Sequence, residues 1–271
     1  DNLSDQELGA SMPFTVPVPI FRTMCTHQGR LVIANTLEDP GIVRRSMPGL
    51  AGTFESQEYI YPDSGGAEVT AVVSHNGVLL AFTENSVYSL EEFNAPRPLT
   101  QGIGCIAPRS IRALPTGTLV WLGRDGFYGM SQTKTGLSIG FLSGPIDRTT
   151  RFGINRARAR MAVACLDPDS QEYRCALPMS GSPKNTLILT FDGVHWRRQL
   201  LDIEIADWCQ LLDWRQYVVA VGKEASPDTA AEVKARGGSN RTEVFVMNRS
   251  TKNYVPPTRK VVYRSAWIRG D

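Results

Sequence analysis

The feature that most constrains the fold is a turn-then-strand unit that recurs along the chain. Its clearest copy spans residues 115–131, where two runs of strand-forming residues, 119–122 and 127–131, flank Arg124-Asp125-Gly126. Glycine supplies the left-handed backbone conformation that a tight turn needs, so this segment predicts a β-hairpin. Similar turns open strands at residues 31, 79, 173 and 217.

The spacing of these five units predicts a repeat architecture. Successive units, anchored at residues 31, 79, 119, 173 and 217, are 48, 40, 54 and 44 residues apart, close to the roughly 40–50 residues of a four-stranded propeller blade. One small sheet cannot bury its faces alone, and radial stacking of several sheets solves that problem. We therefore predict an all-β fold, a β-propeller of about five four-stranded blades. Six blades are possible, and a β-sandwich has similar hairpins.

The ends of the repeat region set the expected domain boundaries. Residues 1–19 contain Pro13, Pro17 and Pro19, which disfavour helix and predict an extended, Pro-rich arm. The propeller is expected over residues 20–258 and a terminal strand over 259–271. Residues 223–241 interrupt the last blade, and a capping serine, a proline and a Gly-Gly stop predict a short helix there. A surface loop is the alternative for this insertion.

Composition narrows the function classes. The chain has 271 residues, 42% of them hydrophobic, and a net charge of +2, so it can bury one substantial core but carries no global polyanion-binding signature. No apolar run approaches the roughly 20 residues of a membrane-spanning helix. Five cysteines at irregular spacing do not suggest a disulfide framework. Cys165 and Cys175 could face each other across a hairpin, although two buried thiols are the favoured interpretation.

Sequence patterns of catalysis are missing. The chain contains no Gly-x-Ser-x-Gly elbow, no Walker phosphate loop and no His-Glu-x-x-His. We expect Asp63, Asp167 and Asp169 to be turn residues, and His27 and His75, at equivalent turns, to be structural. The prediction is therefore a non-enzyme with no catalytic residue, no cofactor and no metal. A carboxylate pair assembled from distant blades remains open, because glycosidases use such pairs.

The candidate functional residues are arginines. Arg156, Arg158 and Arg160 alternate with alanine, and Arg148 and Arg151 lie close by in sequence. In an extended segment the period of two would place the three alternating arginines on one face. That face could contact an adjacent subunit of a ring or the phosphates of DNA in a channel. The alternative without a binding role is a solvated strand edge whose charge prevents aggregation. We favour the subunit contact, because a net charge of +2 and sliding DNA both argue against tight phosphate binding.

Four segments of the chain are similar to those of a known group of proteins. They are Gly117-Thr-Leu-Val-Trp-Leu-Gly-Arg-Asp-Gly-Phe-Tyr-Gly, Leu79-Leu-Ala-Phe-Thr-Glu-Asn-Ser-Val-Tyr-Ser-Leu, Gly104-Cys-Ile-Ala-Pro-Arg-Ser and Tyr263-Arg-Ser-Ala-Trp. In these segments the chain resembles β-propeller proteins of bacteriophage virions, namely the tail nozzle and packaged-DNA stabilisation proteins of short-tailed phages. The resemblance covers residues 70–131 best.

The resemblance implies a structural role. It implies a homo-oligomeric ring around the DNA channel of the virion tail, in contact with neighbouring tail or connector proteins, which helps retain or pass the packaged genome. Non-specific contact with packaged DNA is part of that expectation, and a membrane span is not. The alternative function is a carbohydrate-binding or glycoside-processing propeller, which five tryptophans would permit: Trp121, Trp196, Trp208, Trp214 and Trp267.

Overall fold

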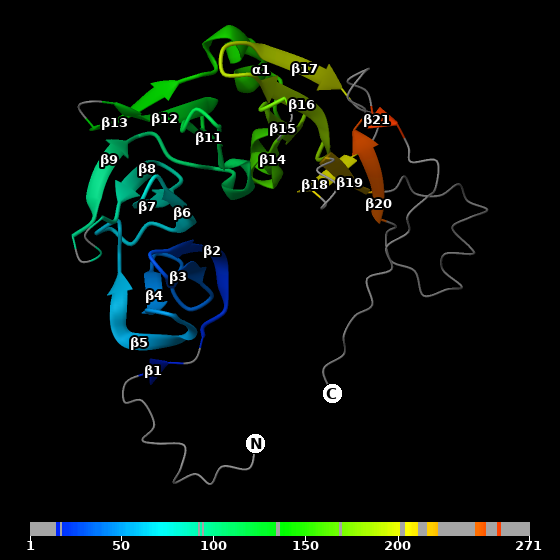
Figure 1. Cartoon of the computed structure of the whole chain (residues 1–271). Helices are drawn as coiled ribbons and strands as arrows, with labels where there is room; N and C mark the ends of the chain where they lie inside the picture. Colours follow the sequence, from blue (N-terminus) through cyan, green and yellow to red (C-terminus); the bar gives the residue numbers. More distant parts are fainter. Residues whose placement is uncertain are drawn as a thin grey trace, which may run out of the picture. The chain divides into compact units, whose positions relative to one another are not determined.

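The computed structural model describes residues 15–16, 18–91, 93, 95–133, 136–167, 170–200, 204–210, 216–221, 242–247 and 254–255. The chain divides into two compact units, Asp1–Ile106 and Ala107–Asp271. Antiparallel β-sheet dominates both units (Figure 1). No helix in the described ranges is long and apolar enough to cross a bilayer.

The first unit contains two sheets. One sheet has the order β1-β5-β4-β3-β2 and the other the order β6-β7-β8-β9. The strands are β1 (Thr15–Val16), β2 (Phe21–His27), β3 (Arg30–Thr36), β4 (Val43–Met47), β5 (Leu50–Ile60), β6 (Val69–His75), β7 (Val78–Thr83), β8 (Ser86–Ser89) and β9 (Arg97–Gln101).

The second unit contains three four-stranded sheets, each with its strands in sequence order. The first is formed by β10 (Arg112–Ala113), β11 (Leu119–Leu122), β12 (Phe127–Thr133) and β13 (Gly136–Phe141). The next is formed by β14 (Val163–Leu166), β15 (Tyr173–Pro178), β16 (Asn185–Phe191) and β17 (Trp196–Leu200). The last is formed by β18 (Glu204–Gln210), β19 (Gln216–Val221), β20 (Thr242–Met247) and β21 (Tyr254–Val255).

The predicted repeat is confirmed. The five anchor positions fall in β3, β7, β11, β15 and β19, each of which is the second strand of its sheet once the arm strand β1 is left out of the first sheet. The turns that precede β3 and β7 are tight for the expected reason. Gln28 and Gly29 have φ of 47° and 72°, and Asn76 and Gly77 have φ of 48° and 79°. Two consecutive left-handed residues are the requirement of the hairpin turns that glycine and asparagine favour.

Adjacent sheets within each unit bury apolar side chains against each other. In the first unit, Val32 and Val43 of one sheet share a core with Val72 and Leu79 of the next. In the second unit, Val163 and Ile188 of β14–β17 share a core with Ile205 and Trp208 of β18. A small sheet thus gains its stability from its neighbour, as expected for stacked repeats.

The extended arm expected over residues 1–19 contains a short peripheral strand, because β1 pairs with β5. The structure departs from the predicted elements elsewhere. Strand β9 was not predicted, and it lies at the edge of its sheet, where Pro98 is tolerated. Four helical segments that were not predicted lie in connections between sheets: η1 (Pro108–Ser110), η2 (Gly144–Ile146), α1 (Asp147–Phe152) and η3 (Arg156–Met161). The predicted helix in 223–241 and the terminal strand 259–271 lie outside the described residues.

Two residues of the Gly104–Ser110 segment have structural roles. A Cβ atom on Gly104 would lie 2.3 Å from the carbonyl oxygen of Thr83, so only glycine fits against the β7–β8 turn. Ser110 is buried, accepts the Leu122 N–H on its Oγ at 2.9 Å, and offers its carbonyl oxygen to the Tyr173 hydroxyl at 2.8 Å. The residues that carry the resemblance in this segment therefore stabilise the fold.

The two cysteines flanking the β14–β15 hairpin do not face each other. The register pairs Cys165 with Arg174 and Ala164 with Cys175, so the two thiols lie on opposite faces of the sheet. Both are buried. The favoured interpretation, two buried thiols, is therefore confirmed, and a disulfide between them is excluded by the register.

Candidate functional site

The predicted arginines lie in the connection between β13 and β14, which we call the arginine connection (residues 142–162). Its first residues are fixed by the hairpin that opened the sequence analysis. Ser143 is buried and its Oγ accepts the Phe127 N–H at 2.6 Å. A Cβ atom on Gly126, which has φ of +156°, would lie 2.7 Å from that Oγ. The glycine of the turn therefore lets the arginine connection pack closely against the sheet.

The short helix α1 follows the 3₁₀ turn η2 (Gly144–Ile146). Asp147 lies in its first turn and Arg151 in its last, and their side chains form an (i, i+4) ion pair at 2.6 Å. The acidic group near the N-terminus and the basic group near the C-terminus both interact favourably with the helix dipole. Thr150 is buried and its Oγ1 donates to backbone carbonyls of the preceding turn. Arg151, a predicted site residue, is therefore committed to the helix.

The end of α1 is tied to the turn between β15 and β16. A Cβ atom on Gly153 would lie 2.7 Å from the Thr149 carbonyl oxygen, so glycine is required where the helix ends. Asn155 donates its backbone N–H to Pro178 and its side-chain amide to the Ser182 carbonyl oxygen, at 2.9 and 2.8 Å. These hydrogen bonds hold the connection rigidly against the sheet of β14–β17.

The expectation of an extended arginine row is wrong. Residues Arg156–Met161 form the 3₁₀ helix η3. With about three residues per turn, the side chains of Arg156, Arg158 and Arg160 leave the axis in different directions rather than on one face. Ala159 is 1% exposed and anchors η3 to the protein. The tertiary burial of this alanine, in a segment without β-branched residues, explains why the chain coils here instead of extending.

Arg156 forms a hydrogen bond within the arginine connection. Its Nη2 donates to the carbonyl oxygen of Thr150 at 2.9 Å, near the C-terminal end of α1. A cation at this end of a helix satisfies a carbonyl group that lacks a partner within the helix. Arg156 and Arg151 also oppose the effect of burial on Tyr128, whose pKa is raised because its ring is desolvated and Asp125 lies near.

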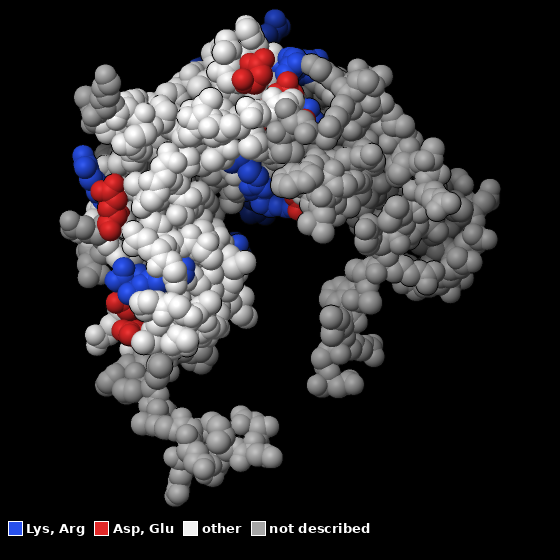
Figure 2. Space-filling model, in the orientation of Figure 1, with Lys and Arg blue, Asp and Glu red and all other residues white. Residues whose placement is uncertain are grey.

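The remaining predicted arginines project into solvent. Arg148 on α1 and Arg158 and Arg160 on η3 are exposed, and no carboxylate of the described residues forms an ion pair with them. On the face in Figure 2, several of the basic side chains lie beside acidic ones. The structure thus divides the five predicted residues into two that stabilise the connection and three that are available for contacts.

A pocket of about 260 Å³ lies beside α1, and we call it the α1 pocket. Helix α1 contributes Arg148, Thr149 and Phe152, and Gly153 follows it. The adjacent sheet contributes Met179, Leu187 and Arg198. The lining of the pocket therefore combines two arginines with apolar residues and contains no acidic residue.

Sequence reasoning missed Arg198. The residue lies on β17, an edge strand, opposite Leu189, and therefore on the same face of the sheet as Leu187. The sequence signal for Arg198 is its position between Trp196 and Leu200 in the last strand of a blade. The strand period of two places these three residues on one face of the sheet edge.

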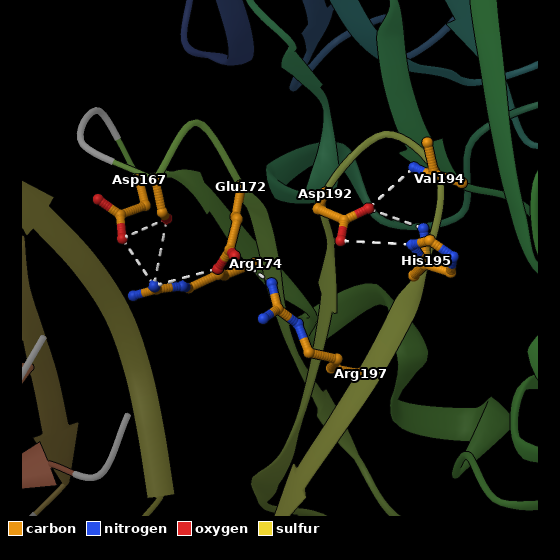
Figure 3. A network of polar contacts seen from close by, with 8 residues as sticks. Asp167, Glu172, Arg174, Asp192, Val194, His195 and Arg197 are labelled. Carbon is orange, nitrogen blue, oxygen red and sulfur yellow. Dashed lines mark hydrogen bonds and ion pairs between the residues drawn. The ribbon is translucent and has the colours of Figure 1, made fainter. Parts of the chain in front are cut away.

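A separate cluster of charges lies between the β14–β15 and β16–β17 loops (Figure 3). Arg174 lies between two carboxylates, 2.6 Å from Asp167 and 3.4 Å from Glu172. Arg197 forms an ion pair with the other side of Glu172, which is only 8% exposed. Both carboxylates are thus committed to arginines that link neighbouring loops, which is a structural arrangement.

The turn residues behave as expected from the sequence. Asp63 accepts the Gly65 N–H on Oδ1 at 3.0 Å. Asp167 accepts the Ser170 hydroxyl at 2.8 Å, whereas Asp169 lies outside the described residues. His27 ends β2, and its Nδ1 is hydrogen-bonded to the Ser74 hydroxyl at 2.9 Å.

The described tryptophans are used in packing. Trp121 is 0% exposed. Trp196 stacks on Phe191 with ring centroids 4.7 Å apart and donates its indole N–H to Leu142, the first residue of the arginine connection. Trp208 is buried and donates to the Val163 carbonyl oxygen. The side chains of Trp214 and Trp267 lie outside the description.

Solved structures resemble this arrangement of sheets. Virginiamycin B lyase from Staphylococcus aureus aligns over 87% of this chain and 71% of its own, with a TM-score of 0.51 and 10% sequence identity. A candidate 6-phosphogluconolactonase from Bacteroides uniformis aligns over 88% and 70%, with a TM-score of 0.52 and 15% identity. The chain is a β-propeller.

At these identities the likeness concerns the fold alone. The β-propeller fold carries enzymes as well as proteins of other kinds, so the fold does not select a function. The sequence matches no protein-family model and no curated protein.

Proposed function

We propose that this β-propeller is a structural protein of a bacteriophage virion. It forms part of the tail, nozzle or head-to-tail assembly around the DNA channel and helps retain or pass the packaged genome. Its partners are other copies of itself in a ring and the neighbouring tail or connector proteins. Two observations support the proposal: the resemblance of the 79–90, 104–110 and 117–129 segments to tail proteins, and the character of the arginine connection.

The arginine connection carries the proposal. Arg158 and Arg160 project into solvent from a segment that is fixed by Ala159 and by hydrogen bonds to the β15–β16 turn. Long side chains on a rigid base lose little backbone entropy when they bind, so such a segment is well suited to a specific protein contact. Arginine is also enriched at protein interfaces, where its planar group pairs with carboxylates in two hydrogen bonds.

A contact with protein fits this geometry better than a contact with DNA. The arginines of η3 point in different directions, and the net charge of the chain is only +2. Strong binding to a phosphate backbone needs many cations along one track. Contacts with packaged DNA are therefore non-specific and weak, and the main partners of Arg158 and Arg160 are carboxylates of an adjacent subunit.

The proposed role is not enzymatic. The neighbouring carboxylates of Asp167 and Glu172 are both neutralised, by Arg174 and Arg197. The resemblance to tail proteins transfers no catalytic residue. We expect the purified chain to be inactive on glycosides.

The double substitution Arg158→Ser/Arg160→Ser tests the subunit contact. Sedimentation velocity should show that the unsubstituted chain forms rings and that the variant remains monomeric, with an unchanged melting temperature. Arg97→Ser, which removes another exposed arginine on β9, is the control and should leave assembly unchanged. Unchanged rings with a weaker, less salt-dependent affinity for DNA would indicate the channel instead. If neither assembly nor DNA affinity changes, the arginines are a solvated surface.

The carbohydrate-binding alternative has lost part of its basis. Three of the five tryptophans that suggested it are engaged in packing or in hydrogen bonds to the backbone. A glycan-array screen of the purified chain separates the two functions. Saturable binding to a glycan class would favour the alternative, whereas rings without glycan binding would favour the virion protein.

A further inference from the structure

The α1 pocket selects its ligand by chemistry. The exposed residues Arg148 and Arg198 give its lining a positive charge, and Phe152 and Met179 contribute apolar surface above the buried Leu187. Phe152 is 75% exposed, so its ring is accessible to a ligand. A ligand that fits must place an apolar side chain in the pocket and carboxylates at the two arginines.

One segment of this chain has that composition. Residues 1–10 contain Asp1, Leu3, Asp5 and Glu7, and no lysine or arginine occurs before Arg22. In an extended bound segment, residues 1, 3, 5 and 7 share one face. That face presents a leucine flanked by carboxylates, about 7 Å away on either side given the rise of a strand. The charge and the apolar residue both complement the α1 pocket.

The segment has a long reach from its point of attachment. Strand β1 is held at the edge of its sheet by pairing with β5. Residues 4–14, which link Leu3 to β1, span up to about 35–40 Å when extended. Leu3 can therefore bind a surface outside the sheet that holds β1.

We propose that residues 1–10 of one copy bind in the α1 pocket of a second copy. Leu3 occupies the apolar part of the pocket, and the carboxylates of Asp1 and Asp5 pair with Arg148 and Arg198. The inference rests on the proposed self-assembly and adds to it an exchanged arm, which links adjacent subunits at a site separate from Arg158 and Arg160.

Binding of a synthetic peptide tests the chemistry of the pocket. A fluorescent peptide of residues 1–10 is titrated with the full chain at low concentration, followed by fluorescence anisotropy. We expect saturable binding that weakens about tenfold with Arg148→Ser/Arg198→Ser in the chain, and about tenfold with Leu3→Ser in the peptide. Arg97→Ser is the matched control for a lost surface arginine. Absence of saturable binding, or binding indifferent to both changes, overturns the inference.

A photocrosslink identifies the copy that supplies the arm. Benzoylphenylalanine replaces Phe152 in the full chain, and irradiation followed by mass spectrometry should join it to residues 1–10 in a covalent dimer. The control probe replaces Val194, which is 71% exposed in the turn at the opposite end of the β16–β17 hairpin and should not capture the arm. Capture within one chain, or capture of another segment, overturns the exchange.

The two proposals fail in distinguishable ways. If rings form and depend on Arg158 and Arg160 but Phe152 captures no arm, the arm exchange is wrong and the proposed function stands. If no dimer or ring forms at any concentration, self-assembly and the exchange both fail, and the proposed function loses its support independently of the peptide titration.

Discussion

The guanidinium of Arg156 donates a hydrogen bond of 2.9 Å to the carbonyl oxygen of Thr150. This contact links the start of η3 to the last turn of α1. The arginines of one short sequence therefore have different roles: Arg156 stabilises the connection, whereas Arg158 and Arg160 face solvent.

That division predicts different effects on stability. Arg156→Ala should lower the free energy of unfolding by about 1 kcal/mol, because it removes a charge-assisted hydrogen bond that is only partly screened by solvent. Arg158→Ala and Arg160→Ala should each change it by less than about 0.5 kcal/mol. Urea denaturation followed by tryptophan fluorescence measures all three. If Arg156→Ala changes the free energy of unfolding as little as the other two substitutions do, Arg156 does not stabilise the connection.

Gly104 is predicted to be irreplaceable. Gly104→Ala places a methyl group 2.3 Å from the backbone oxygen of Thr83, and a backbone atom cannot move aside as a flexible side chain can. We expect a loss of about 3 kcal/mol or more. The control is Gly52→Ala in β5 of the same unit, where a Cβ atom meets nothing within 4 Å. A thermal melt in which both variants match the unsubstituted protein would contradict the close contact.

The thiol of Cys25 is predicted to react slowly. Burial raises the pKa of Cys25 to about 11, although a hydrogen bond from the backbone of Ser74 partly opposes the shift. At pH 8 its thiolate fraction should be about a hundredfold smaller than in the unfolded chain. Mass spectrometry after timed iodoacetamide treatment should therefore find Cys25 modified rapidly only in denaturant. Rapid alkylation of the native protein would refute this.

The β16–β17 turn is predicted to weaken in acid. Asp192 accepts the backbone N–H groups of His195 and Val194, which lowers its pKa below 3.8. A folded pKa below the unfolded one means that the ionised carboxylate stabilises the fold above pH 3.8, and that this stabilisation is lost as the pH falls through the folded value. Asp192→Asn should therefore be less stable than the unsubstituted protein at pH 6. Denaturation curves should show a smaller difference in stability between the two proteins at pH 3 than at pH 6. An equal difference at both pH values would show that the charge of Asp192 does not contribute to stability.

The sequence predicted the repeat because its signals are local. Gly29, Gly77 and Gly126 occupy turns whose backbone conformation depends on a few neighbouring residues, and the apolar runs that follow them are strands in the structure. The five anchors could therefore be placed from residue types and spacing alone.

The arginine connection could not be predicted in the same way. Its path depends on Ser143, which binds the backbone of Phe127, and on Asn155, which binds a turn far along the chain. Such tertiary contacts override the alternation of arginine and alanine that suggested a strand. Arg198 was not predicted for a related reason: it lies far from Arg148 in sequence, and only folding brings the two residues to one pocket.

The central claim is that the chain is a structural component of a phage tail. Immunogold electron microscopy of particles from cells that express the encoding genome tests it most directly, with antibodies raised against the purified chain. The account predicts gold labels at one end of intact particles, at the tail. Unlabelled particles, in a lysate that contains abundant soluble chain, would contradict it.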